Sequence, residues 1–387
     1  MKKVVVASDS FKGSVSSLEV AESVEKAVYK VFPKCEVVKI PIADGGEGTM
    51  ETLVYAMNGK MITCKVHNPL MNMISASYGI LDDGKTAVIE VASASGLTLI
   101  PVNKRNPMKT TTYGTGELIK DALERGCTKF LIGLGGSATN DAGVGMLQAL
   151  GFRFLNKEGK SVGTGGGILH EIVMIDCSCA LSQLQNAEFT IACDVSNPFS
   201  GENGAAHMFA RQKGADSFMI DTLDQGLKHF SLIIKRQLNM DIDNVPGAGA
   251  AGGLGGCFLA FLSASLEPGI EMVLNALHFE ERIRGVDLII TGEGKLDKQT
   301  GMGKAPSGVL REAQKQKIPV IAIGGLVEGA EKLNQDGFLS VFSIQSGVMT
   351  LEKAMDKALT KENIECTVTQ ILRIIRYVYE SNIEKSR

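Results

Sequence analysis

Residues 3–40, KVVVASDSFKGSVSSLEVAESVEKAVYKVFPKCEVVKI, contain one complete strand, loop, helix and second strand. The β-branched run from Lys3 to Ala7 predicts a strand, and Ser16 to Val31 carries apolar residues at helical spacing. Ser16 and Glu19 match a capping box, which predicts that the helix begins just after the polar loop. Glu36 to Ile40 predicts the second strand. Two strands joined through a helix are typical of a parallel sheet.

The same rhythm returns near the other end of the chain. Short apolar runs precede glycine-rich or polar segments at Asp287 to Ile290, Val320 to Ile323 and Leu339 to Ile344. Residues 60–91 instead contain alternating segments broken by Asn-Pro and Asp-Asp-Gly, a pattern that predicts antiparallel strands. These patterns predict one parallel-sheet domain built from both ends of the chain.

With 387 residues, the chain exceeds what one hydrophobic core usually serves, so we expect two domains. The fold class that we predict is α/β, with a discontinuous parallel-sheet domain and an inserted second α/β domain whose sheet is mixed. Residues 1–60 and 285–387 are assigned to the first domain and residues 61–284 to the second. The assignment of residues 110–150 is left open.

Composition excludes several classes of protein. Hydrophobic residues make up 44% and charged residues 21%, which excludes a disordered chain. With 40 basic and 43 acidic side chains the net charge is −3, so no overall positive field favours nucleic acid or an anionic membrane surface. No apolar stretch reaches the roughly 20 residues that cross a bilayer, and the first residues lack the pattern of a secretory signal. We therefore expect a cytoplasmic protein.

Two polar loops near the start of the chain are candidate binding sites. The loop Ser10 to Ser14 places Lys12 just before a helix, where free backbone N–H groups favour an anion. In the next loop, Asp44 and Glu47 lie among Gly45, Gly46 and Gly48, and carboxylates among glycines suit Mg²⁺ or a substrate hydroxyl. Ordinary capping of a helix is the alternative explanation for each loop.

Three later segments have a similar composition. Gly135 to Asp141 combines glycines with hydroxyl, amide and carboxylate groups that suit polyols or phosphates, and a purely capping role is the alternative. Asp194 follows an apolar strand and precedes Asn197, although formation of a turn alone explains both residues. Residues 291–304 supply acids and lysines around glycines, the combination that phosphoryl transfer needs.

Standard signatures of other enzyme classes are absent or misplaced. No Walker A motif is present, and the five histidines have no partner that indicates a hydrolase triad. Residues 247–252 satisfy G-x-G-x-x-G but do not follow a predicted strand, which weakens a dinucleotide-binding interpretation. A sugar-acid binding protein and a hydroxyacid dehydrogenase stay open as alternatives to a kinase.

Taken in order, six loops together resemble the bacterial type I glycerate kinase family. The resemblance runs from about residue 3 to beyond residue 350. The segments that carry it are Asp9-Ser-Phe-Lys-Gly-Ser14, Ala43-Asp-Gly-Gly-Glu-Gly-Thr49, Gly135-Gly-Ser-Ala-Thr-Asn-Asp141, Ala192-Cys-Asp-Val195, Pro246-Gly-Ala-Gly-Ala-Ala-Gly-Gly253, and Thr291-Gly-Glu-Gly294 with Asp297, Gln299 and Thr300. This resemblance implies a flavodoxin-like domain with an inserted domain, and ATP- and Mg²⁺-dependent phosphorylation of D-glycerate. It favours 2-phosphoglycerate as the product, with 3-phosphoglycerate as the alternative.

We expect a monomer or a homodimer. We also expect the following roles for individual residues. Lys12 binds the glycerate carboxylate or the transferred phosphoryl group, and Asp44 or Asp194 accepts the hydroxyl proton, with a slight preference for Asp194. Glu293 and Asp297 bind Mg²⁺. The expected substrate- and phosphate-binding residues are Ser10, Gly13, Ser14, Gly45, Gly46, Gly135, Gly136, Ser137, Asn140, Asp141, Asn197, Lys295 and Lys304.

Overall fold

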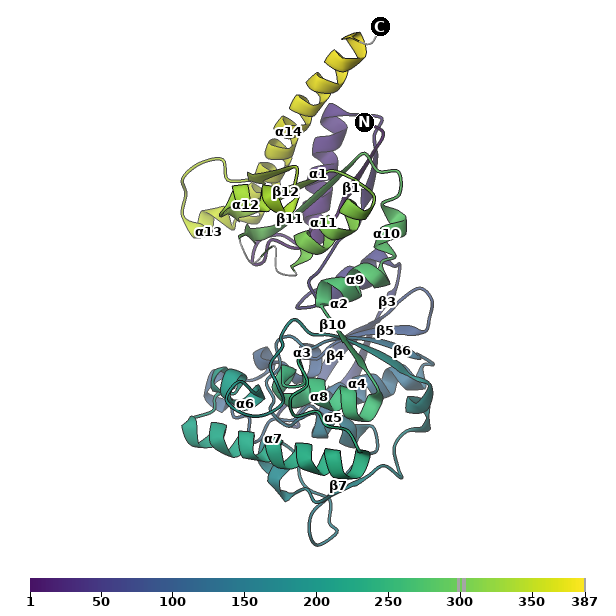
Figure 1. The fold of residues 1–387 in the computed structure, drawn as a ribbon, viewed down its shortest axis with the longest axis vertical. Helices are drawn as coiled ribbons and strands as arrows, with labels where there is room; N and C mark the ends of the chain where they lie inside the picture. Colours follow the sequence, from purple (N-terminus) through teal and green to yellow (C-terminus); the bar gives the residue numbers. More distant parts are fainter. Residues whose placement is uncertain (298–299, 301–303, 386–387) are drawn as a thin grey trace. The chain divides into compact units, whose positions relative to one another are not determined.

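The computed structural model describes residues 1–297, 300 and 304–385. Contacts within the chain divide it into two compact units (Figure 1). The parallel-sheet unit consists of residues 1–44 and 273–387, and the inserted unit consists of residues 45–272.

A five-stranded sheet forms the centre of the parallel-sheet unit, and every neighbouring pair of its strands is parallel. Its strands are β1 (Lys3–Val6), β2 (Glu36–Lys39), β11 (Leu288–Leu296), β12 (Val320–Val327) and β13 (Ser340–Ser343). The order across the sheet is β13-β12-β11-β1-β2. Counted along this unit, that order is 2-1-3-4-5, the order of flavodoxin-like sheets. The predicted fold class of this unit is therefore confirmed.

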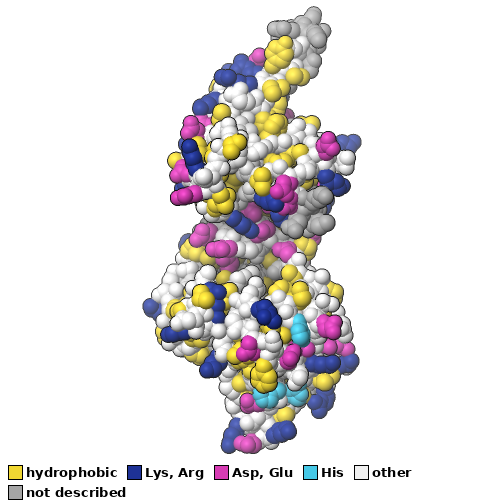
Figure 2. Space-filling model, turned by 90° about the vertical axis from the view of Figure 1, so that its left-hand side faces the viewer, with side chains coloured by type: hydrophobic (Ala, Val, Ile, Leu, Met, Phe, Trp, Pro, Cys, Tyr) yellow, Lys and Arg dark blue, Asp and Glu magenta, His cyan; other side chains and the backbone are white. Residues whose placement is uncertain are grey.

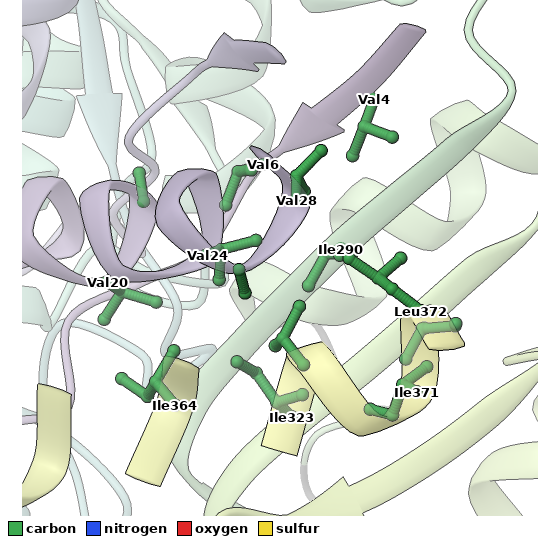
Figure 3. Packing of buried hydrophobic residues seen from close by; sticks show 14 of the residues in the cluster. Val4, Val6, Val20, Val24, Val28, Ile290, Ile323, Ile364, Ile371 and Leu372 are labelled. Atoms are coloured by element: carbon green, nitrogen blue, oxygen red, sulfur yellow. The ribbon is translucent and has the colours of Figure 1, made fainter. Parts of the chain in front are cut away.

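Two helices, α1 (Ser17–Val31) and α14 (Lys357–Lys385), pack against each other on one face of this sheet. Figure 3 shows valines of α1 meeting Ile364, Ile371 and Leu372 of α14 and strand residues such as Ile290. Side chains of α11 (Ala305–Lys315) do not belong to this cluster, although α11 contacts β11 and β12, so it covers the opposite face. Helices on both faces explain why β1 and β12 are largely apolar. The other helices of this unit are α9 (Gly269–Ala276, which begins in the inserted unit), α10 (Phe279–Arg282), α12 (Ala330–Asp336) and α13 (Leu351–Ala354).

The inserted unit contains a six-stranded sheet of order β10-β9-β6-β5-β4-β3. Its strands are β3 (Lys60–His67), β4 (Met73–Ile80), β5 (Thr86–Glu90), β6 (Lys129–Gly133), β9 (Glu188–Ala192) and β10 (Ser265–Glu267). The pairs β3–β4 and β4–β5 are antiparallel, and the pairs from β5 to β10 are parallel. The sheet is mixed, as predicted. A separate antiparallel pair joins β7 (Arg153–Leu155) to β8 (Met174–Asp176).

Helices of the inserted unit pack on this sheet and on one another. They are α2 (Thr49–Ala56), α3 (Ala92–Ser95), α4 (Tyr113–Glu124), α5 (Val144–Ala149), α6 (Ala205–Phe209), α7 (Ser217–Leu238) and α8 (Ala250–Leu262), with 3₁₀ turns at Leu97–Leu99, Val102–Lys104, Gly166–Glu171, Ser182–Asn186 and Arg211–Lys213. Inside α8, Ala251, Gly252 and Gly253 have left-handed φ angles, so the helix is kinked there.

The compact units divide at residues other than those expected from the sequence. Contacts place the first division after Asp44, whereas the sequence-based boundary follows residue 60. The reason is α2, which packs on β4 and β5 of the inserted unit. The second division follows Met272, compared with residue 284 in the sequence-based assignment. Residues 110–150 all lie in the inserted unit.

Strand β11 is longer than the sequence pattern predicts. We expected a loop from residue 291, but β11 continues through Leu296 because its ladder with β12 extends to the pair Leu296–Val327. Glycines permit this close pairing. A Cβ on Gly292 would lie 2.4 Å from the carbonyl oxygen of Ile323, and one on Gly325 would lie 2.7 Å from the carbonyl oxygen of Gly294. Glu293 is therefore a strand residue and not a loop residue.

On the face that Figure 2 shows, acidic and basic side chains are interspersed, without a large area of one sign. Among the helices of the described residues, none combines the length and apolarity needed to cross a membrane.

Candidate active site

The polar segments of the parallel-sheet unit lie at the carboxyl ends of β1 and β11. These two strands are neighbours, and the chain leaves them toward opposite sides of the sheet, since β2 lies beyond β1 and β12 lies beyond β11. In doubly wound sheets, ligands bind outside the carboxyl ends of the strands at such a switch point. The topology thus brings Asp9 to Ser14 close to Glu293 and its neighbours.

Lys12 forms an ion pair with Asp44 at this edge. The Lys12 Nζ atom lies 2.9 Å from Asp44 Oδ2, and the lysine side chain is largely exposed. The segment is held by a backbone hydrogen bond from Phe11 N–H to the Val15 carbonyl and by the predicted capping box at the start of α1. Gly13 has φ of +81°, a left-handed conformation that favours glycine. The predicted cation is therefore presented by a well-defined turn.

Asp9, at the end of β1, is a buried carboxyl group that we did not assign a role from the sequence. It is 5% exposed, and its Oδ1 accepts a hydrogen bond of 2.6 Å from the backbone N–H of Ser10. Burial, together with repulsion by Asp44, raises the pKa of Asp9 to about 7. A carboxyl group that titrates near neutral pH can both accept and release a proton under working conditions.

Glu293 and Asp297 share a lysine neighbour. Lys304 Nζ lies 3.7 Å from Glu293 Oε2 and 3.8 Å from Asp297 Oδ1. Thr300 donates a 2.7 Å hydrogen bond to Glu293 Oε1 and accepts one from the backbone N–H of Asp297. Burial raises the pKa of Glu293 above its ordinary value despite the hydrogen bond from Thr300. Lys295 Nζ lies 3.5 Å from Asp297 Oδ2 and 3.0 Å from Glu328 Oε2.

Glu293 and Asp297 fit only a Mg²⁺ site in which the protein supplies few ligands. Within residues 1–297, 300 and 304–385, no group of three or more His, Cys, Asp or Glu residues is placed to hold a metal ion. Mg²⁺ commonly uses one or two carboxylates and completes its shell with water and substrate phosphates. The two carboxylates beside Lys304 match that pattern. Gln299 and Gly303, which belong to the same sequence segment, lie outside the described residues.

In the inserted unit, the second and third glycine-rich loops meet. They line a cavity of about 280 Å³ together with Glu47, Glu90, Ser93 and Thr98. The predicted residues on its wall are Gly45, Gly46, Gly135 and Gly136. Met50 N–H donates to Glu90 Oε1, and burial raises the pKa of Glu90. Glu90 was missed because it ends a strand with no polar neighbour in sequence.

The remaining residues of the third loop face the interior. The Asp141 carboxylate accepts hydrogen bonds from the backbone or hydroxyl groups of Thr111, Thr112, Gly143 and Gly145, so it organises the loop. Asn140 is fully buried, and neither side-chain polar atom has a hydrogen-bond partner among the described residues.

Lys213 is a further buried residue to which the sequence assigned no role. Its Nζ donates to Ser137 Oγ at 3.1 Å and to the Thr139 carbonyl at 2.6 Å. Burial lowers the pKa of Lys213 to about 7, although the charge of Asp141 opposes this. Nothing in the local sequence around Lys213 indicates burial, because its neighbours Arg211 and Gln212 are polar.

Within residues 247–253, Gly252 packs closely on this third loop, and Gly249 packs on the carbonyl oxygen of Pro198. A Cβ on Gly252 would lie 2.1 Å from the carbonyl oxygen of Thr139. Ser137 Oγ also donates to the carbonyl of Ala251, at 3.4 Å. The G-x-G-x-x-G pattern thus has a packing explanation.

Asp194 and Asn197 lie together in the inserted unit, after β9. Asp194 Oδ1 accepts a 2.9 Å hydrogen bond from the backbone N–H of Gly269, and its side chain is exposed. Asn197 Nδ2 donates to the carbonyl of Asn203 at 2.9 Å, a contact within its own loop. Asp44, the other candidate base, is the last residue of the first segment of the parallel-sheet unit.

Ser10 and Ser14 flank the exposed lysine of the first loop. Ser14 Oγ lies 2.7 Å from Thr360 Oγ1 and is engaged by that hydroxyl group, while Ser10 is half-buried. The structure thus gathers Ser10, Lys12, Gly13, Ser14, Asp44, Glu293, Lys295, Asp297 and Lys304 in one unit and the other predicted residues in the second.

Comparison with known proteins agrees with this organisation. The model of the glycerate kinase family matches residues 4–376. A glycerate kinase of Bacillus cereus is 50% identical over 98% of this chain and 100% of its own length, and a glycerate 2-kinase of Escherichia coli is 48% identical over 91% and 93%. A crystal structure assigned as glycerate kinase 2 from Salmonella typhimurium LT2 superposes with a TM-score of 0.90, at 42% identity, over 98% of this chain and 99% of that one. The chain therefore belongs to the glycerate kinase family and is a kinase that phosphorylates an alcohol group.

Proposed function

We propose that the protein transfers the γ-phosphoryl group of ATP to a hydroxyl of D-glycerate with the help of Mg²⁺. The observation that carries this proposal is the gathering of Lys12, Asp9, Glu293, Asp297 and Lys304 at the carboxyl ends of two adjacent parallel strands. Phosphoryl transfer depends on positioned cations, a metal site and a proton acceptor more than on covalent catalysis by the protein.

The reaction forms a bond between a glycerate oxygen and the γ-phosphorus and breaks the bond from that phosphorus to the bridging oxygen of ADP. Lys12 supplies a positive charge to the glycerate carboxylate or to the transferred phosphoryl group. Its exposed side chain already pairs with a carboxylate, Asp44, at 2.9 Å, so an incoming anion competes for the same ammonium group.

Glu293 and Asp297 are the residues that we propose to hold Mg²⁺. When bound, the ion neutralises negative charge that develops on the phosphate oxygens. Lys304 and Lys295 lie beside these carboxylates and offer charge to the same phosphates. This proposal does not depend on a third acidic ligand.

Three carboxyl groups are candidates for the base that accepts the hydroxyl proton. Asp194 and Asp44 are the candidates from the sequence, and the structure adds Asp9. Asp44 is paired with Lys12, and Asp194 is exposed and accepts a backbone hydrogen bond. The pKa of about 7 for Asp9, caused by burial and by Asp44, lies near the value at which a base works best.

For the inserted unit taken by itself, we propose a site that binds hydroxyl groups. The cavity of about 280 Å³ presents glycine backbone and the hydroxyls of Ser93 and Thr98, which suit a small hydroxylated ligand. Gly45, Gly46, Gly135 and Gly136 line this cavity. Ser137, Asn140 and Asp141 shape the adjoining loop, and Asn197 stays a proposed contact.

The test is formation of ADP from ATP in the presence of D-glycerate and Mg²⁺, with EDTA and with omission of glycerate as controls. No ADP above these controls would overturn the proposal. Phosphorus NMR of the product decides the regiochemistry. We expect 2-phosphoglycerate, in keeping with the name of the relative from Escherichia coli, and 3-phosphoglycerate is the alternative.

Membership in a kinase family favours this activity over the two alternatives from the sequence, a sugar-acid binding protein and a hydroxyacid dehydrogenase. Reduction of a nicotinamide cofactor by glycerate, without ATP, would favour the dehydrogenase. A cytoplasmic location and a monomeric or homodimeric state stay predictions, which fractionation and light scattering would test.

A further inference from the structure

A cavity of about 410 Å³ lies in the parallel-sheet unit beyond the carboxyl ends of β11, β12 and β13. Its wall is mostly apolar and comes from four parts of this unit. The large apolar side chains on the wall include Phe11, Leu326, Ile344, Val348, Met349 and Met355. A volume of this size is typical of sites that enclose a small organic molecule.

Few polar side chains line this cavity, and most of them are engaged. Ser14 Oγ and Thr360 Oγ1 lie 2.7 Å apart, and Lys12 pairs with Asp44. Gln345 differs from them, because its Oε1 atom is buried and has no hydrogen-bond partner among the described residues. An unsatisfied buried acceptor is costly, so a ligand that brings a donor into the cavity gains from pairing with it.

This lining favours a flat, largely apolar ligand that carries a hydrogen-bond donor. Glycerate does not fit, because its closely spaced oxygens would lose their hydrogen bonds to water against an apolar wall. Adenine has two apolar faces and an exocyclic amino group that donates hydrogen bonds. Met349 and Met355 suit an aromatic ring, since a thioether contacts such rings favourably.

The cavity is continuous with the charged residues of the proposed active site. Lys12 and Gly294, the neighbour of Glu293, both line it. A Cβ on Gly294 would lie 3.6 Å from the backbone nitrogen of Lys12, so Gly294 lies against the turn that carries this lysine. The phosphates of a nucleotide whose adenine lies in the cavity can therefore reach Lys12 within the parallel-sheet unit.

We propose that this cavity binds the adenine of the nucleotide and that Gln345 accepts a hydrogen bond from the exocyclic amino group. The inference rests on the proposed function and assigns the nucleotide base to the parallel-sheet unit. Gln345 is then a residue that determines nucleotide specificity.

Binding of ADP and IDP in the absence of glycerate tests this assignment by calorimetry. Hypoxanthine has an oxygen where adenine has the amino group, so the wild type should bind ADP more tightly than IDP, by about three- to tenfold. Gln345→Leu should bring the ratio of the two dissociation constants close to one. Gln345→Glu should raise the ratio, since a carboxylate accepts a hydrogen bond but repels the hypoxanthine oxygen. An unchanged ratio in both variants would overturn the proposal.

Controls separate this inference from the proposed kinase activity. Gln183→Leu, at an exposed glutamine of the inserted unit, should leave the ratio at the wild-type value. If Gln345→Leu does not fold, Ala354→Phe narrows the same cavity and should weaken ADP binding at least tenfold; undiminished binding would overturn the proposal. Wild-type enzyme that phosphorylates glycerate while the variants keep the wild-type ratio refutes the adenine site alone. Wild-type enzyme that binds ADP but forms no phosphoglycerate refutes the proposed function alone.

Discussion

Replacement of Asp9 by Asn should make the protein more stable at alkaline pH and at the same time less active. The folded-state pKa of Asp9 is raised from 3.8 to about 7 by burial and by repulsion from Asp44. The contribution of this group to stability is therefore complete below pH 3.8 and is lost as the pH rises through about 7. Each unit of this pKa shift corresponds to about 1.4 kcal/mol, so at pH 8 the ionised Asp9 carboxylate lowers the free energy of unfolding by up to about 4 kcal/mol.

Asn removes that cost while it keeps the shape of the side chain and an oxygen that can accept from Ser10 N–H. We expect Asp9→Asn to raise the free energy of unfolding at pH 8 by a few kcal/mol and to change it little at pH 4. Urea denaturation followed by circular dichroism at both pH values measures the difference. Asp336→Asn, at a partly exposed residue paired with Lys332, is the matched control and should change stability by less than about 1 kcal/mol at either pH.

Two results would refute this reasoning in different ways. If Asp9→Asn has the same pH dependence as the wild type, the carboxyl group does not have a raised pKa. If the variant is more stable at pH 8 but phosphorylates glycerate at the normal rate, Asp9 is not the base. If Asp9 is the base, Asp9→Asn should lower turnover by about 10²- to 10⁴-fold, whereas binding of glycerate should be largely unchanged.

Lys12→Ala should strongly lower kcat/KM for glycerate. Stability should change by no more than about 1 kcal/mol, because an exposed ion pair contributes little to folding. Unchanged kcat and KM in steady-state kinetics would return Lys12 to a structural role. Asp194→Asn and Asp44→Asn, each titrated with Mg²⁺, separate the other candidate bases: excess metal should not restore a variant of the base, and normal turnover of Asp194→Asn would exclude that residue. Between pH 7 and pH 9 the folded wild type has a neutral Lys213, whose pKa is lowered to about 7, whereas the unfolded chain binds a proton there because the pKa returns to 10.5. The wild type should therefore become more stable over this range, and Lys213→Met should lack that rise. Unfolding midpoints that rise in parallel in the variant and the wild type would contradict the burial of this charge.

Much of the architecture could be predicted from local patterns. The first strand, helix and strand, including the capping box at Ser16, agree with β1, α1 and β2. Residues 60–91 form the antiparallel part of a mixed sheet, as their alternation indicates. These features are accessible because side-chain period and capping depend on residues a few positions apart.

Tertiary structure decided the chemical character of individual groups. Asp9 and Lys12 are three residues apart in one polar loop, yet Asp9 is buried with a raised pKa and Lys12 is exposed beside Asp44. Glu293 belongs to a strand because β12 pairs with it, and Gln345 has an unsatisfied acceptor because of what surrounds it. Burial, pairing and electric field arise from segments that are distant in sequence. A local pattern therefore identified which loops carry polar groups, whereas only the folded chain determined which of those groups are charged, buried or available to a ligand.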